Sequence, residues 1–172
     1  VNPAGDQEIY VVLRRLAGQM GELENLRIDP TAIALINRFA QIRSGLILIM
    51  GGTGQGKTTL AAHIYKRLVT NSGGRGITIQ EPIEYATQGP MGEGGFSLDF
   101  PVYDNDWASP LQRSMRSNPS YIFVGEILTP QAAAMTISAA ATGTLVISTI
   151  HGGTIGEGIT RLISMAAGAP QA

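Results

Sequence analysis

The sequence contains no cysteine, which excludes disulfide bonds and metal sites built on thiolates. It also lacks long basic runs, since none exceeds a pair such as Arg14-Arg15. The 12 Lys and Arg residues are balanced by 13 Asp and Glu residues, which gives a formal net charge of −1. Because nucleic-acid-binding domains usually carry a basic patch, we expect no nucleic acid among the partners of this chain.

The chain begins without a charged-then-apolar leader, so we expect no signal peptide. Residues 127–150 carry no charge and approach the length of a membrane span. This stretch is rich in Ala, Ser, Thr and Gly, with Pro130 near its start and Gly143 inside it. A helix that ends at a glycine, followed by a buried strand, explains it better than a direct membrane span. The lack of cysteine favours a cytoplasmic location.

The most informative motif is a glycine-rich loop over residues 51–59, which reads GGTGQGKTT and fits the pattern G-x-x-x-x-G-K-[ST]. The apolar residues 45–50 before it predict a buried parallel strand, and the spacing of apolar residues after it predicts a helix. In such a unit, backbone N–H groups and the helix N-terminus attract phosphate. A chance glycine run is the alternative, and the flanking elements disfavour it.

The loop therefore predicts a nucleotide site, with Lys57 bridging the β- and γ-phosphates and the Thr58 hydroxyl ligating Mg²⁺. The residues expected to bind the nucleotide are Gly52, Thr53, Gly54, Gln55, Gly56, Lys57, Thr58 and Thr59.

Apolar strands alternate with helical patterns along the rest of the chain. Strands are predicted at residues 76–80, 121–124 and 144–150, and less clearly at 8–14. Helices are predicted from residue 30 to about 42, in the segment after the phosphate loop, at 107–117, from 130 to about 142, and from about 155. The glycine-rich residues 86–105 show little periodicity and are expected to form a loop. The alternation predicts an α/β fold with a mostly parallel sheet and helices on both faces.

Four polar side chains follow the carboxyl ends of the predicted strands, where parallel sheets bind ligands: Glu81, Glu84, Glu126 and His151. Glu126 is the candidate to position an attacking water and to help hold Mg²⁺. Glu84 is expected near the metal, with Glu81 behind it as support, and His151 near the γ-phosphate. The plainer alternatives are a surface acid for Glu126, a turn cap for Glu84 or Glu81, and a structural histidine for His151.

Gly125 precedes Glu126 where the second motif of phosphate-loop ATPases usually has an aspartate. Without that aspartate, we expect Mg²⁺ to be held partly through water.

Four ordered blocks together resemble the hexameric ATPases that power type II and type IV secretion and type IV pilus retraction. The blocks are the phosphate loop and residues 78–84 (TIQEPIE), 111–126 and 141–151. The resemblance implies a RecA-like P-loop NTPase fold and Mg²⁺-dependent ATP hydrolysis, with Glu126, Glu84 and His151 in the active site. It also implies a homo-hexamer docked peripherally at the inner membrane, with components of a secretion or pilus machine as partners.

Within that family, Arg14 resembles an arginine that reaches the nucleotide from an amino-terminal domain. The resemblance therefore implies that residues 1–28 are the remnant of that domain and its linker. Residues 29–172 would be the RecA-like ATPase core, without the carboxyl-terminal helical domain.

The chain departs from the family pattern at three places, one of which is the unusual glycine-rich stretch at residues 89–95. Glu81 stands where aspartate is usual, and Ile127-Leu128-Thr129 follows Glu126 where the family commonly has an Arg-Asp pair. The missing Arg-Asp pair supports an alternative function, a nucleotide-binding scaffold with little turnover. A small P-loop phosphotransferase is a third alternative, but residues 86–105 contain no Arg or Lys for the lid that such an enzyme needs.

Overall fold

The strands run in the predicted α/β order in the computed structural model, which describes residues 20–168. They are β1 (Gly45–Gly51), β2 (Gly74–Gln80), β3 (Gly89–Met91), β4 (Gly95–Pro101), β5 (Tyr121–Glu126) and β6 (Leu145–His151). They form one six-stranded sheet in the order β1-β6-β5-β2-β4-β3. Every neighbouring pair is parallel except β3 with β4, which confirms the mostly parallel sheet.

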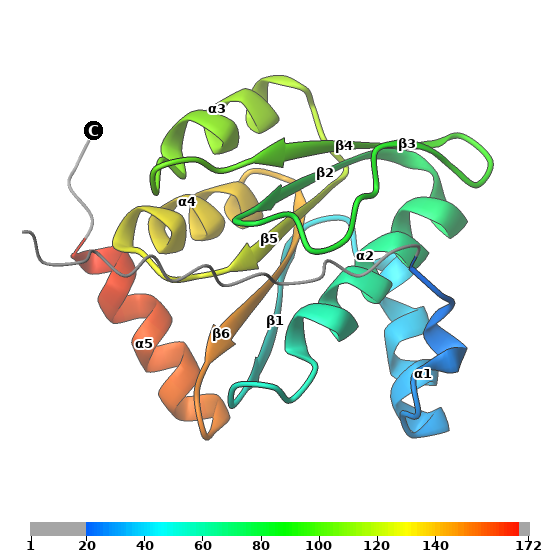
Figure 1. The fold of residues 1–172 in the computed structure, drawn as a ribbon, viewed down its shortest axis with the longest axis horizontal. Coiled ribbons are helices and arrows are strands. Elements are labelled where there is room, and N and C mark those ends of the chain that lie inside the picture. The colour runs from blue at the N-terminus through cyan, green and yellow to red at the C-terminus, as the bar shows by residue number, and fades with distance from the viewer. Residues whose placement is uncertain (1–19, 169–172) are drawn as a thin grey trace, which may run out of the picture.

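Five α-helices cover the two faces of this sheet (Figure 1). They are α1 (Pro30–Arg38), α2 (Lys57–Ser72), α3 (Ala108–Arg116), α4 (Pro130–Ala141) and α5 (Ile155–Ala167), and short 3-10 turns span Leu23–Asn25 and Phe39–Gln41. Strand β5 shows how the layers form. Phe123 packs with the α2 side of the core, whereas Ile122 and Val124 pack with the α3 and α4 side. A strand that is apolar at every position is therefore buried on both faces.

Local sequence signals set the starts of three helices. Asp29 caps α1 by accepting a hydrogen bond from Thr31 N at 2.7 Å, and Thr129 caps α4 by accepting one from Ala132 N at 3.1 Å. Thr154 and Glu157 form a reciprocal capping box at α5. A proline occupies the first turn of α1 and of α4, as predicted from sequence.

Two predictions about this architecture are wrong. Strand β1 is half-buried along its whole length, because within residues 20–168 it lies at the edge of the sheet and pairs only with β6. Residues 86–105 contain the β3–β4 hairpin, whose turn uses the left-handed residues Gly92 (φ 61°) and Gly94 (φ 74°). Gly95 faces the Met91 and Val69 carbonyl groups so closely that a Cβ atom would not fit. These glycines interrupt the alternation by which a strand is recognised.

The uncharged residues 127–150 form helix α4 and strand β6. Within residues 20–168, no helix is long and apolar enough to cross a membrane. The possible strand at residues 8–14 and the candidate nucleotide ligand Arg14 lie outside the described residues.

Candidate active site

The phosphate loop joins β1 to α2 and is shaped by two glycines in the left-handed region. Gly54 has φ 76° and Gly56 has φ 77°, conformations that disfavour residues with a side chain. Gly56 is also the N-cap of α2, and no side chain caps the first turn of that helix. The first N–H groups of α2 are therefore free of a side-chain cap and can donate hydrogen bonds to an anion.

Two polar contacts close this loop on itself. The Lys57 ammonium donates a hydrogen bond to the Gly52 carbonyl at 2.9 Å, and the Gly52 N–H donates one to Gln55 Oε1 at 2.6 Å. The only lysine of the loop thus already points back over the residues that precede the helix, which is where phosphate groups would lie.

A β-bulge at Gly125 directs Glu126 toward the phosphate-loop side of the sheet. Val124 is paired with Ser148, but Glu126 is paired with Thr149, so Gly125 has no partner on β6. Because adjacent residues of β6 point to opposite faces, the bulge moves Glu126 away from the face that holds Val124. It places the carboxylate on the face covered by α2.

Glu126 meets His151 at the end of the neighbouring strand β6. His151 Nε2 lies 3.0 Å from Glu126 Oε1, and about a third of each side chain is exposed. The distance is that of an ion pair, although no well-aligned hydrogen bond reaches Oε1. The heavy atoms do not fix which imidazole nitrogen carries the proton, so the contact is defined by its distance. Both residues were predicted to lie on one edge of the sheet, and the pairing of β5 with β6 makes them direct neighbours there.

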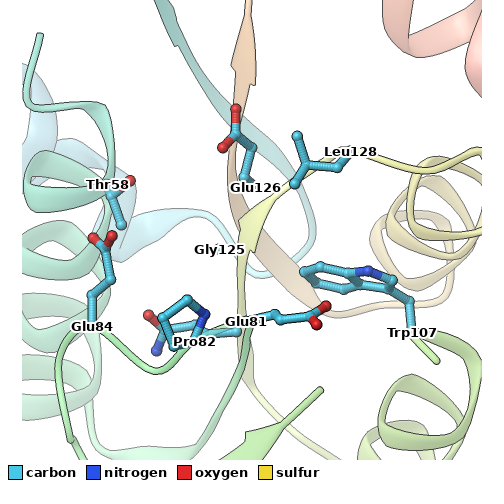
Figure 2. A pocket seen from close by; sticks show the side chains of 9 residues that line it. Thr58, Glu81, Pro82, Glu84, Trp107, Gly125, Glu126 and Leu128 are labelled. Atoms are coloured by element: carbon cyan, nitrogen blue, oxygen red, sulfur yellow. The ribbon is translucent and has the colours of Figure 1, made fainter. Parts of the chain in front are cut away.

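A cavity of about 100 Å³ lies beside the phosphate loop at the carboxyl ends of the strands. Its lining includes Thr58, Glu84 and Glu126, the three residues proposed from sequence as metal ligands. Figure 2 shows the Glu84 carboxylate facing Thr58, whereas Glu81 extends toward Trp107 on the other side. The two carboxylates thus point in different directions, and the supporting role expected of Glu81 stays a prediction.

The segment that carries Glu84 is fastened at two points. On one side, the Tyr85 hydroxyl lies 3.1 Å from Thr59 Oγ1 on α2. On the other, the Thr87 hydroxyl and N–H donate hydrogen bonds to the Asp99 carboxylate on β4, at 2.6 and 2.8 Å. These contacts hold the acidic segment between the phosphate-loop helix and the sheet.

A second, larger cavity of about 330 Å³ adjoins the loop near Gln55 and Lys57. Its walls are mainly apolar and include Leu26 and Ile28 from the segment before α1, with Met50 and Leu60. Such a concave apolar site suits a flat aromatic ligand.

Residues 20–168 contain no group of three or more His, Cys, Asp or Glu side chains that could hold a metal ion alone. The Thr58 hydroxyl, with a nearby carboxylate, nevertheless fits Mg²⁺, which usually keeps several waters and binds through few protein ligands and substrate phosphates. The structure thus brings the predicted residues together, and their chemical roles stay predictions.

A family model described as "Type II/IV secretion system protein" matches residues 4–171. The chain belongs to the type II/IV secretion system protein family. It is 35% identical over 159 residues to a type II secretion system protein E of Pseudomonas aeruginosa, covering 90% of this chain and 30% of that protein. It is 32% identical over 164 residues to the type IV pilus assembly ATPase PilB of Thermus thermophilus, covering 94% of this chain and 17% of that protein.

The fold is similar to that of the pilus retraction motor PilT crystallised with ADP, with a TM-score of 0.76 and 28% identity. The match covers 88% of this chain and 43% of PilT. It confirms the predicted RecA-like P-loop fold. The chain therefore spans less than half of the length of each of these three proteins.

Sequence reasoning missed two residues with side-chain nitrogen atoms that line the cavity in this family member, Gln80 and Trp107. Gln80 ends β2 and directly precedes Glu81, so its position beside the predicted acidic residues was the available signal. Trp107 precedes α3 with only 2% of its surface exposed, and its sequence position gave no comparable signal.

Proposed function

We propose that this chain is the ATPase core of a motor subunit that hydrolyses ATP with Mg²⁺ and powers a type IV secretion or type IV pilus machine. One observation carries the proposal. Thr58, Glu84 and Glu126 line a single cavity beside the phosphate loop, and His151 lies 3.0 Å from Glu126. The names of the relatives, a pilus assembly ATPase and a retraction motor with bound ADP, support it.

The loop and the α2 N-terminus would bind the phosphates. Lys57 would exchange its bond to the Gly52 carbonyl for phosphate oxygens, since an ammonium pairs more strongly with an anion than with a neutral carbonyl. The apolar cavity bounded by Leu26, Ile28 and Leu60 would receive the nucleotide base.

Bound Mg²⁺ would neutralise phosphate charge, with the Thr58 hydroxyl as a ligand and Glu84 and Glu126 close to its waters. Glu126 would accept a hydrogen bond from the attacking water and so orient it toward the γ-phosphate. His151 would hold the Glu126 side chain in place, because the two groups lie within ion-pair distance.

The same proposal includes assembly as a homo-hexamer on the cytoplasmic side of the inner membrane, where components of a secretion or pilus machine would be the partners. The presence of secretion and pilus proteins among the relatives supports this part. Arg14 would reach the nucleotide in that assembly, and residues 29–172 would form the core of each subunit.

The test is phosphate release by the full-length protein with and without Mg²⁺. Glu126→Gln should lower turnover by about 10²-fold or more, because the oriented water loses its acceptor, while ATP affinity stays within a few-fold. Glu93→Gln is the matched control, since Glu93 is exposed in the β3–β4 turn. Unchanged turnover in Glu126→Gln would remove Glu126 from its role.

Tight ATP binding without turnover in the assembled ring would instead favour the scaffold function. The observation behind that second candidate is the sequence Ile127-Leu128-Thr129 after Glu126, in which Ile127 is buried in the core and no charged group is present.

A further inference from the structure

Gln80 carries a side-chain amide that is buried without a partner. Only 1% of Gln80 is exposed, and neither Nε2 nor Oε1 has a hydrogen-bond partner. Leaving such a group unpaired forfeits its hydration without return, so buried amides almost always meet protein groups or water. Gln80 lines the 100 Å³ cavity that Thr58 and Glu84 also line. Its amide can therefore form hydrogen bonds to a water or ligand in that cavity.

The sheet register explains why this amide reaches the active site. Thr78 is paired with Phe123, which packs on the α2 side of the core, so Gln80, two residues further on, points to that same face. It therefore shares a face with the phosphate-loop helix and with the redirected Glu126.

Gly125 provides the space next to Gln80. A Cβ atom at residue 125 would lie 3.3 Å from Gln80 Cγ, closer than ordinary packing allows. The missing side chain at the bulge thus lets the amide of the adjacent strand lie beside the residue before Glu126. The neutral Gln80 amide thus lies next to Gly125, the position at which the second motif of phosphate-loop ATPases usually has an aspartate.

We infer that the Gln80 amide is a positioning residue that binds a water molecule of the metal–nucleotide complex, between the Thr58 side of the cavity and Glu126. The inference rests on the proposed function. An amide can accept from one water and donate to another oxygen, and the cavity exceeds the roughly 15 Å³ that one water needs. The residues described hold no three-ligand metal cluster, and Mg²⁺ usually keeps several of its waters, so a group that binds those waters would help to hold the metal.

The experiment measures Mn²⁺ affinity by electron paramagnetic resonance, using the full-length protein with a non-hydrolysable ATP analogue. Nucleotide affinity in EDTA and the urea-unfolding midpoint are measured in parallel. Gln80→Met, which keeps the length but not the hydrogen bonds, should weaken Mn²⁺ binding 3- to 10-fold and leave metal-free nucleotide affinity unchanged. Gln80→Glu should tighten Mn²⁺ binding, because a negative charge then faces the metal's waters.

Thr136→Val is the matched control. The Thr136 hydroxyl on α4 is likewise fully buried and without a partner, but it does not line this cavity. This variant should leave metal and nucleotide affinities unchanged.

Gly125→Ala reaches the same amide from strand β5. It should weaken Mn²⁺ binding in the parent protein and have no additional effect when combined with Gln80→Ala, because the two changes act on one contact.

Mn²⁺ affinity within twofold of the parent in both Gln80→Met and Gln80→Glu would overturn the inference. An equal loss of metal-free nucleotide affinity in Gln80→Met would overturn it too, because the amide would then act on the fold of the site. If the parent protein bound no nucleotide at all, the proposed function would fail before Gln80 was tested.

Discussion

Asp99 on β4 offers the sharpest test of how the segment that carries Glu84 is held against the sheet. Its carboxylate accepts four hydrogen bonds, from Thr78 Oγ1 at 2.7 Å, Thr87 Oγ1 at 2.6 Å, Thr87 N at 2.8 Å and Gln88 N at 3.1 Å. Asp99→Ala removes all four acceptor contacts. We therefore expect it to loosen the segment that follows Glu84 and to destabilise the whole domain.

The size of the effect follows from these bonds. At about 1 kcal/mol net for each of the four, Asp99→Ala should lower the free energy of unfolding by about 4 kcal/mol. Asp99→Asn should lose about half as much. Its amide oxygen can still accept from the Thr87 and Gln88 N–H groups, and its NH₂ group can donate to the two hydroxyls, which also accept. Only the charge assistance disappears, which is about half of the total, or about 2 kcal/mol.

Urea unfolding monitored by Trp107 fluorescence, with circular dichroism as a second probe, measures both variants under the same conditions. Ser109→Ala is a suitable control, since its hydroxyl bonds only to Asp106 at an exposed helix start. Equal losses for Asp99→Ala and Asp99→Asn, or a loss below about 1 kcal/mol for Asp99→Ala, would refute the reasoning from four separate acceptor contacts.

Three further changes test the loop, the core and a helix cap. Lys57→Ala should weaken ATP binding about 100-fold, because a charge-assisted phosphate contact of about 3 kcal/mol is lost; a fluorescent-nucleotide titration checks this, and unchanged affinity would contradict it. Leu111→Ala should lower the free energy of unfolding by about 2–5 kcal/mol, since the side chain is fully buried between α3 and the sheet. Thr154→Ala should cost about 1 kcal/mol by removing the α5 capping box. Urea unfolding measures both losses, and values near zero would speak against the packing or the cap.

The elements predicted correctly are those whose signals are local. Strands β5 and β6 are short apolar runs, and α1 and α4 begin with a capping side chain followed by proline. Parallel pairing then requires that the ends of these strands meet. For this reason the shared edge of Glu126 and His151 could be predicted from sequence, whereas their direct contact depends on the strand order.

The features that could not be predicted depend on contacts with other strands, which the local sequence does not reveal. The bulge at Gly125 exists only relative to β6, so the direction of Glu126 is not encoded in the residues 121–126 alone. The β3–β4 hairpin is specified by long-range contacts such as Asp99 to Thr87, which no periodicity reveals. Gln80 carries no charge and stands at a strand end, and only its burial without a partner reveals its chemical interest.

The half-exposed edge of β1 has a consequence for handling this polypeptide. Gly45–Gly51 carries no charge and no proline, and one row of its backbone amides and carbonyls faces away from β6. An uncharged strand of that kind is a template on which a second molecule can add its own strand. Within residues 20–168 the strand that leads into the phosphate loop therefore presents an open edge, and a lysine introduced there should disfavour strand addition by a second molecule.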